Sequence, residues 1–180
     1  MKDQQSLKAL ILLRRQPLVQ EVGSISEELC GDLIRYAETH PGDIKNSMDS
    51  RESLSSNKDA QRLEYDITEF YDQVYVKDQS LIDRIESECG IEVSSIRIGV
   101  LQPKSILDWH IDYETSLRVH ADLSHDSEIY FRTNDGEQVL KKKRLALYKL
   151  NASWYHKVEN QSDSIRYALI GNFVDEVQSA

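Results

Sequence analysis

Cysteine is scarce in this chain of 180 residues, which contains only Cys30 and Cys89. Two cysteines in a chain of this size do not suggest a disulfide framework, and a reducing cytoplasm is the simplest location for such a protein. We therefore predict a cytoplasmic protein. A chain of this length can bury a sizeable apolar core.

Long hydrophobic runs are also missing. The most apolar stretch near the N-terminus, Leu7 to Leu13, is interrupted by Lys8 and is too short to span a bilayer. It leads into Arg14-Arg15, where a signal peptide would carry a small-residue cleavage site. We expect an early strand or a turn of a core helix here, and no membrane association.

Positive charge is in deficit. The chain has 22 Lys and Arg residues against 31 Asp and Glu residues, so its formal net charge is 22 − 31 = −9. An acidic protein lacks the electrostatic footprint of a nucleic-acid binder, so we expect no nucleic-acid partner. The one basic run, Lys141-Lys142-Lys143-Arg144, is predicted to be a solvated turn between strands and not a docking patch.

The N-terminal half has helical patterns. Ser24 followed by Glu27 resembles a capping box and begins a predicted helix that stops at Pro41-Gly42. Two more helices are predicted, over Leu63 to Val76 and from Ser80 to Gly90. The polar segment 43–62 between them is either a surface loop or a lid over a site.

No βαβ alternation is visible after Gly90, and the chain there reads as about eight short strands. Asn134-Asp135-Gly136 is a strong hairpin signal between two of them. We predict a mainly β fold of antiparallel sheets, a sandwich or barrel with helices packed outside. We expect one domain, in which residues 1–92 provide helical support and a possible lid and residues 93–174 form the β core.

Two predicted strands carry polar faces. In the first, Leu107 alternates with Asp108, so that Leu107, Trp109, Ile111 and Tyr113 would share one face and Asp108, His110 and Asp112 the other. On that polar face His110 and Asp112 could bind one ion side by side, and His156 on a neighbouring strand could add a third ligand. Two imidazoles and one carboxylate suit a non-haem Fe(II) ion. A second H-x-D motif, His120-Ala121-Asp122, shows that such a motif decides nothing alone.

The combined pattern is more specific. The chain contains Leu101-Gln102-Pro103, then His110-Ile111-Asp112, Arg118-Val119-His120, and finally His156 with Asn160 and Arg166. Over roughly residues 93–174 it resembles the aspartyl/asparaginyl β-hydroxylase-like Fe(II)- and 2-oxoglutarate-dependent oxygenases, in particular small enzymes of the proline hydroxylase type. This resemblance implies a double-stranded β-helix, with a jelly-roll or cupin-like core.

The resemblance also implies residue roles. His110, Asp112 and His156 look like the iron ligands, and Arg166 looks like the partner of the distal carboxylate of 2-oxoglutarate. A guanidinium suits that role, because it stays charged and pairs a carboxylate bidentately. Arg118 and His120 look like further cosubstrate contacts, which leaves Asp122 as an ordinary polar strand residue.

The expected function is hydroxylation of a C–H bond of a small substrate, with Fe(II), 2-oxoglutarate and dioxygen. The expected substrate is a free amino acid. Two alternatives stay open: the same chemistry on a peptide or protein side chain (Asp, Asn or Pro), and a cupin-like metal-binding protein that does not use 2-oxoglutarate. The sequence makes no prediction about oligomeric state.

Overall fold

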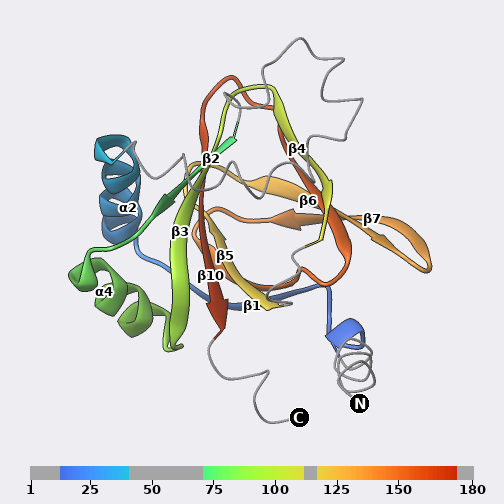
Figure 1. The fold of residues 1–180 in the computed structure, drawn as a ribbon, viewed down its shortest axis with the longest axis horizontal. Helices are drawn as coiled ribbons and strands as arrows, with labels where there is room; N and C mark the ends of the chain where they lie inside the picture. The colour runs from blue at the N-terminus through green and yellow to red at the C-terminus, as the bar shows by residue number, and fades with distance from the viewer. Residues whose placement is uncertain (1–12, 41–70, 112–116, 174–180) are drawn as a thin grey trace, which may run out of the picture.

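The computed structural model describes residues 13–40, 71–111 and 117–173, and its strands form two facing antiparallel sheets (Figure 1). The strands are β1 (Val19–Ser24), β2 (Tyr71–Tyr75), β3 (Val93–Leu101), β4 (Ser105–His110), β5 (Leu117–Asp122), β6 (Ser127–Thr133), β7 (Gly136–Lys142), β8 (Ala146–Asn151), β9 (Tyr155–Asn160) and β10 (Arg166–Phe173). Six form one sheet in the order β1-β8-β5-β10-β3-β2, and four form the other in the order β4-β9-β6-β7. The predicted mainly β fold with a jelly-roll core is confirmed.

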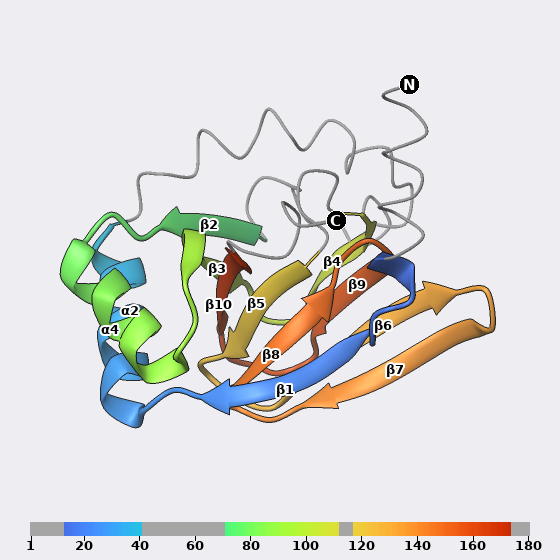
Figure 2. The same ribbon diagram turned by 90° about the horizontal axis from the view of Figure 1, so that it is seen from below.

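Two helices cover the outer face of the six-stranded sheet (Figure 2). Helix α2 (Glu27–Thr39) begins after Ser26, whose side chain accepts a hydrogen bond from the Leu29 amide, so the predicted cap at Ser24 is two residues too early. Helix α4 (Gln79–Cys89) ends at Gly90 with φ of 64°, the left-handed conformation that glycine adopts without strain. Both helices present apolar stripes to the sheet, including Leu29, Leu33, Leu81 and Ile85.

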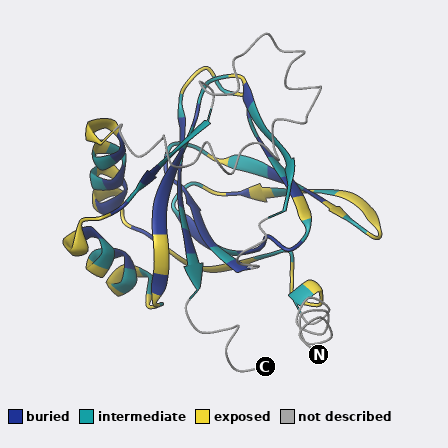
Figure 3. Cartoon of the chain, viewed as in Figure 1, coloured by how far each residue is buried: buried dark blue, intermediate teal, exposed yellow. Residues whose placement is uncertain are grey.

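A second apolar cluster fills the space between the sheets. It combines Leu101, Ala146, Tyr148 and Leu150 of the six-stranded sheet with Ile129, Phe131 and Val158 of the four-stranded sheet. Figure 3 shows buried positions along the strands of both sheets. The six-stranded sheet therefore packs against the helices on one face and against the other sheet on its inner face. A polar side chain on the inner face has no access to bulk water unless a cavity reaches it.

The N-terminal half also contributes strands. Residues 71–75, predicted as part of a helix, form β2, which pairs with β3; the β-branched and aromatic content of this segment suits an edge strand. Strand β1, which was not predicted, pairs with β8 at the opposite edge. Segment 43–62 lies outside the described residues, as does most of Leu7–Leu13. No helix within the described ranges is long and apolar enough to cross a membrane.

Candidate metal and anion-binding site

An extra residue in β4 turns His110 toward the space between the sheets. Leu107 pairs with Val158, and His110 pairs with His156. Between these two pairs the chain advances three residues along β4 but only two along β9. Paired residues of an antiparallel ladder point to the same side, so His110 lies on the same face as Leu107. The predicted alternation, which put these two residues on opposite faces, is wrong because it did not include this bulge.

The His110 and His156 rings face each other across the β4–β9 ladder, with centroids 4.2 Å apart and planes tilted by 53°. His110 Nδ1 donates to the Asp108 carbonyl at 2.6 Å, and His156 Nδ1 donates to the Trp154 carbonyl at 3.0 Å. With Nδ1 donating to a backbone carbonyl, Nε2 is the ring nitrogen that each imidazole can offer to a metal ion. A backbone carbonyl on the second nitrogen is the usual support of a metal-binding imidazole.

Among the described residues, the imidazoles of His110 and His156 are donors that fit a transition-metal ion. The predicted third ligand, Asp112, lies outside the described residues and stays a prediction. Within residues 13–40, 71–111 and 117–173, no group of three His, Cys, Asp or Glu residues could hold a metal.

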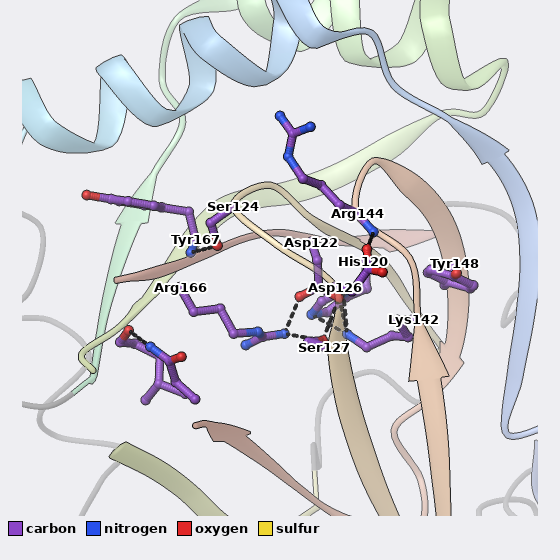
Figure 4. A network of polar contacts seen from close by, with 12 residues as sticks. His120, Asp122, Ser124, Asp126, Ser127, Lys142, Arg144, Tyr148, Arg166 and Tyr167 are labelled. Carbon is purple, nitrogen blue, oxygen red and sulfur yellow. Dashed lines mark hydrogen bonds and ion pairs between the residues drawn. The ribbon is translucent and has the colours of Figure 1, made fainter. Parts of the chain in front are cut away.

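A buried ionic cluster lies between β5, β7 and β10 (Figure 4). Arg166 Nη2 donates to Asp122 Oδ1 at 2.5 Å, and Lys142 Nζ lies 3.0 Å from Asp122 Oδ2. The Ser127 hydroxyl also donates to Asp122, at 2.7 Å. The Lys142 and Asp122 side chains are fully buried and that of Arg166 is 5% exposed. Arg166 and Lys142, from opposite sheets, thus share one carboxylate.

His120 completes this anion cluster, which we define as His120, Asp122, Ser127, Lys142 and Arg166. Lys142 Nζ lies 3.2 Å from His120 Nδ1. Burial and the Lys142 charge hold the pKa of His120 well below its usual value, so the ring is neutral at pH 7. Burial alone would raise the pKa of Asp122. The charges of Lys142 and Arg166 outweigh this effect and hold the pKa below its usual value, so Asp122 stays ionised.

Two predictions fail at this cluster. Asp122 is not an ordinary polar strand residue, and Lys142 is not in a solvated turn. The sequence held the signal for Lys142. The Asn134-Asp135-Gly136 hairpin sets the register that pairs Ser127 with Lys142. Along β7 the exposed Lys141 and the buried Lys142 then alternate, as neighbours in a strand do.

The cluster has more positive than negative charge. Lys142 and Arg166 are cations, His120 is neutral, and among the described residues Asp122 is the one anion within hydrogen-bonding distance of the two cations. In addition, Arg166 Nε is buried and has no hydrogen-bond partner among the described residues. An uncompensated buried cation is costly, and an anionic ligand would remove that cost.

Arg118, a predicted cosubstrate contact, lies farther along the same strands. It pairs with Asn172 of β10 and donates to the Asn172 side-chain oxygen. His120 and Asp122 pair with the next two inner positions of β10, Ile170 and Ala168. The structure thus puts His120 in the cluster with Arg166 and puts Arg118 at a greater distance, where its role stays a prediction.

A comparison with protein-family models decides the family. The model described as Aspartyl/Asparaginyl beta-hydroxylase matches residues 73–176, more than half of the chain. The chain belongs to this family. Family membership confirms the resemblance seen in the sequence and indicates an enzyme of the hydroxylase class. The two facing histidines and the whole anion cluster of this beta-hydroxylase family member lie within the matched region.

Solved structures resemble this beta-hydroxylase family member only distantly. A Bacillus subtilis oxalate decarboxylase variant aligns with a TM-score of 0.44 at 12% identity, covering 59% of this chain and 26% of that one. A cupin domain from Bordetella pertussis aligns with a TM-score of 0.38 at 17% identity, covering 46% and 83%. This chain thus spans about a quarter of the oxalate decarboxylase chain. The search of curated proteins finds no match.

Proposed function

We propose that this protein is an Fe(II)- and 2-oxoglutarate-dependent hydroxylase that acts on a small substrate, a free amino acid. One observation carries the proposal: two inward-facing histidines and a buried anion cluster with surplus positive charge line the same space between the sheets. A metal ion and an anionic cosubstrate are the ligands that these two groups fit.

The metal would be held by His110, His156 and, as predicted from the sequence, Asp112. Their donor atoms are the set that non-haem Fe(II) enzymes use. When bound, Fe(II) supplies the dioxygen chemistry that couples oxidative decarboxylation of 2-oxoglutarate, to succinate and carbon dioxide, with hydroxylation of the substrate. The Nδ1 hydrogen bonds to the Asp108 and Trp154 carbonyls hold the two rings in the orientation required of ligands.

Strand β6 links the metal position to the anion cluster. Phe131 pairs with His156 and its ring centroid is 6.0 Å from that of His156, while Ser127 bonds to Asp122. The two residues are four positions apart on one face, or about 13 Å at roughly 3.3 Å per residue. The His156 side chain extends into this distance from the Phe131 end and the Arg166 side chain from the Ser127 end, so the space between their polar atoms is shorter. A five-carbon keto diacid could bridge the remainder, with its keto acid end at the metal and its distal carboxylate at Arg166.

The side chains around this path would bind, orient and exclude water. Arg166 would take the distal carboxylate, and its buried Nε is a donor without a described partner. Phe131, Ile129 and Val158 form an apolar wall between the two ends. Such a wall strengthens the electrostatic contacts of a bound cosubstrate and keeps water from the reacting atoms.

The proposal is tested by succinate release. Purified protein with Fe(II), ascorbate and 2-oxoglutarate is assayed alone, with the free amino acids one by one, and with short peptides that contain Asp, Asn or Pro. We expect a free amino acid to raise succinate release well above the uncoupled background and a hydroxylated product to appear by mass spectrometry. Stimulation by peptides alone would move the proposal to a peptide substrate, and no 2-oxoglutarate turnover in any mixture would overturn it.

Arg166 provides the matched variant. Arg166→Ala should raise the concentration of 2-oxoglutarate needed for half-maximal rate by about 100-fold, because a charge-assisted, bidentate contact is lost. Arg132→Ala is the control, since Arg132 lies on β6 of the other sheet, is exposed, and pairs with Glu137 at the surface. An unchanged requirement in Arg166→Ala would show that Arg166 does not contact the cosubstrate.

A further inference from the structure

Lys142 is the least expected member of the anion cluster. Its side chain is fully buried although β7 is an edge strand of the four-stranded sheet. Lysine is almost never fully buried without a charged partner. Here it crosses to Asp122 and His120 of β5 in the other sheet, at 3.0 Å and 3.2 Å. Burying the Lys142 ammonium costs free energy, and its effect is to change the net charge of the anion cluster.

Without Lys142, Arg166 and Asp122 would form a neutral pair. Each Asp122 oxygen has its own cation, Oδ1 with Arg166 and Oδ2 with Lys142. Two cations on one carboxylate leave a surplus of one positive charge in a region closed to bulk water. A single additional carboxylate would balance it, and in a low-dielectric site that attraction is much stronger than at the surface.

Lys142 also lies against the ring of His120. Its Nζ is 3.2 Å from His120 Nδ1 and 3.5 Å from His120 Nε2. Burial and the Lys142 charge both lower the pKa of His120, so this ring adds no charge to the cluster at pH 7. The surplus charge that Lys142 provides therefore favours an anionic oxygen at the cluster.

We propose that Lys142 is a positioning and specificity-determining residue, which makes the Arg166–Asp122 pair able to accept a second carboxylate and so selects a keto diacid over a keto monoacid. This inference rests on the proposed function. It assigns to Lys142 the charge balance of the cluster, while Arg166 provides the direct contact with the distal carboxylate. Lys142 acts through Asp122 and His120.

Binding measurements test this without turnover. Zn(II)-loaded protein is titrated by calorimetry with 2-oxoglutarate and with 2-oxopentanoate, a keto acid of equal length that ends in a methyl group. We expect the wild-type protein to bind 2-oxoglutarate at least about 100-fold more tightly, as for loss of charge-assisted hydrogen bonds. Lys142→Met should reduce this preference at least about tenfold and leave the affinity for 2-oxopentanoate unchanged. The control is Lys141→Met, because Lys141 is the exposed neighbour on the same strand.

A charge-balance variant separates this role from a structural one. The double variant Asp122→Asn with Lys142→Met restores a surplus of one positive charge, from Arg166 alone. We expect it to recover most of the preference for 2-oxoglutarate that Lys142→Met loses. If Lys142 only supports the fold, the double variant should bind no better than Lys142→Met, and the proposal would be wrong.

The outcomes distinguish the two proposals. A wild-type protein that does not discriminate between the two keto acids contradicts 2-oxoglutarate as cosubstrate. A wild-type protein that discriminates, together with a Lys142→Met variant that discriminates equally, contradicts the role of Lys142 alone. Each variant is first compared with the wild type by circular dichroism and thermal unfolding. Lys142→Gln replaces Lys142→Met if the latter does not fold, with the same expected result.

Discussion

His110 lies directly across the β4–β9 ladder from His156, with their ring centroids 4.2 Å apart, because β4 contains one residue more than β9 between the two pairs that flank the bulge. The pairing brings together residues that are 46 positions apart in the chain (156 − 110). β-Bulges often redirect a side chain beside a functional site. Here the bulge brings the first predicted ligand to the same side as the second.

The position of His110 relative to Leu107 can be changed. Deleting Asp108 and Trp109 together makes His110 the direct neighbour of Leu107, so that a regular ladder turns His110 to the outer face. We expect Mn(II) affinity, measured by calorimetry, to fall at least about 100-fold while the β-sheet circular dichroism spectrum is retained. Deleting Asp108 alone is the control: it removes the bulge but leaves His110 two positions after Leu107, on the same face and opposite His156, so this variant should bind Mn(II) as the wild type does. Equal Mn(II) binding by the double-deletion variant would show that the face on which His110 lies does not determine metal binding.

The two histidines should contribute to metal binding in a way that other histidines do not. His110→Ala and His156→Ala should each weaken Mn(II) binding at least about 100-fold, because each removes a ligand, a larger loss than the 10- to 100-fold typical of outer-shell partners. His40→Ala is the control, since His40 is exposed at the end of α2. Loss of Mn(II) affinity in His40→Ala of the same size would mean that the measured ion binds elsewhere.

Burial of Lys142 predicts an unusual dependence of stability on pH. Burial lowers the pKa of Lys142 to about 8, against the attraction of Asp122 and with the added repulsion of Arg166. The unfolded lysine has a pKa of about 10.4. Between these values the unfolded state binds more protons than the folded state, so the free energy of unfolding should rise with pH.

Urea unfolding of the ligand-free protein at several pH values from about 7 to about 10 measures this effect. The wild type should gain stability above about pH 8 relative to Lys142→Met, which has no group to titrate at this position. The groups that face Lys142 are Asp122, His120 and Arg166; of these, His120 is already neutral at pH 7. Parallel pH profiles for the two proteins would contradict an ionised, buried Lys142.

Much of the β core could be predicted from sequence because its signals are local. Strong alternation and β-branched residues mark β5 and β3, and Asn134-Asp135-Gly136 marks the β6–β7 hairpin, in which Thr133 pairs with Gly136. Gly90 marks the end of α4. Each of these signals depends on neighbours a few residues away, and the structure confirms each one.

Apart from the helix cap placed at Ser24 instead of Ser26, the failures depend on pairing between distant segments. Strand β2 was predicted as helix because its aromatic residues fit either period, and its partner β3 decides the outcome. The β4 bulge exists only relative to β9. The hairpin register and the alternation along β7 separate Lys142 from the exposed Lys141, but the contact of Lys142 with Asp122 depends on the packing of opposite sheets. For the site, family resemblance predicted roles for His110, His156 and Arg166, and the sequence reading missed Lys142, which shares Asp122 with Arg166.

The central claim is that one ligand spans the metal position and the anion cluster, and the metal dependence of 2-oxoglutarate binding tests it most directly. Calorimetry with 2-oxoglutarate is performed on wild type, His156→Ala and Arg166→Ala, each with and without Mn(II). We predict tight binding only for the wild type with Mn(II), and weak binding when the metal, His156 or Arg166 is removed. Binding of 2-oxoglutarate that is equally tight without Mn(II), or that is insensitive to both substitutions, would contradict the claim.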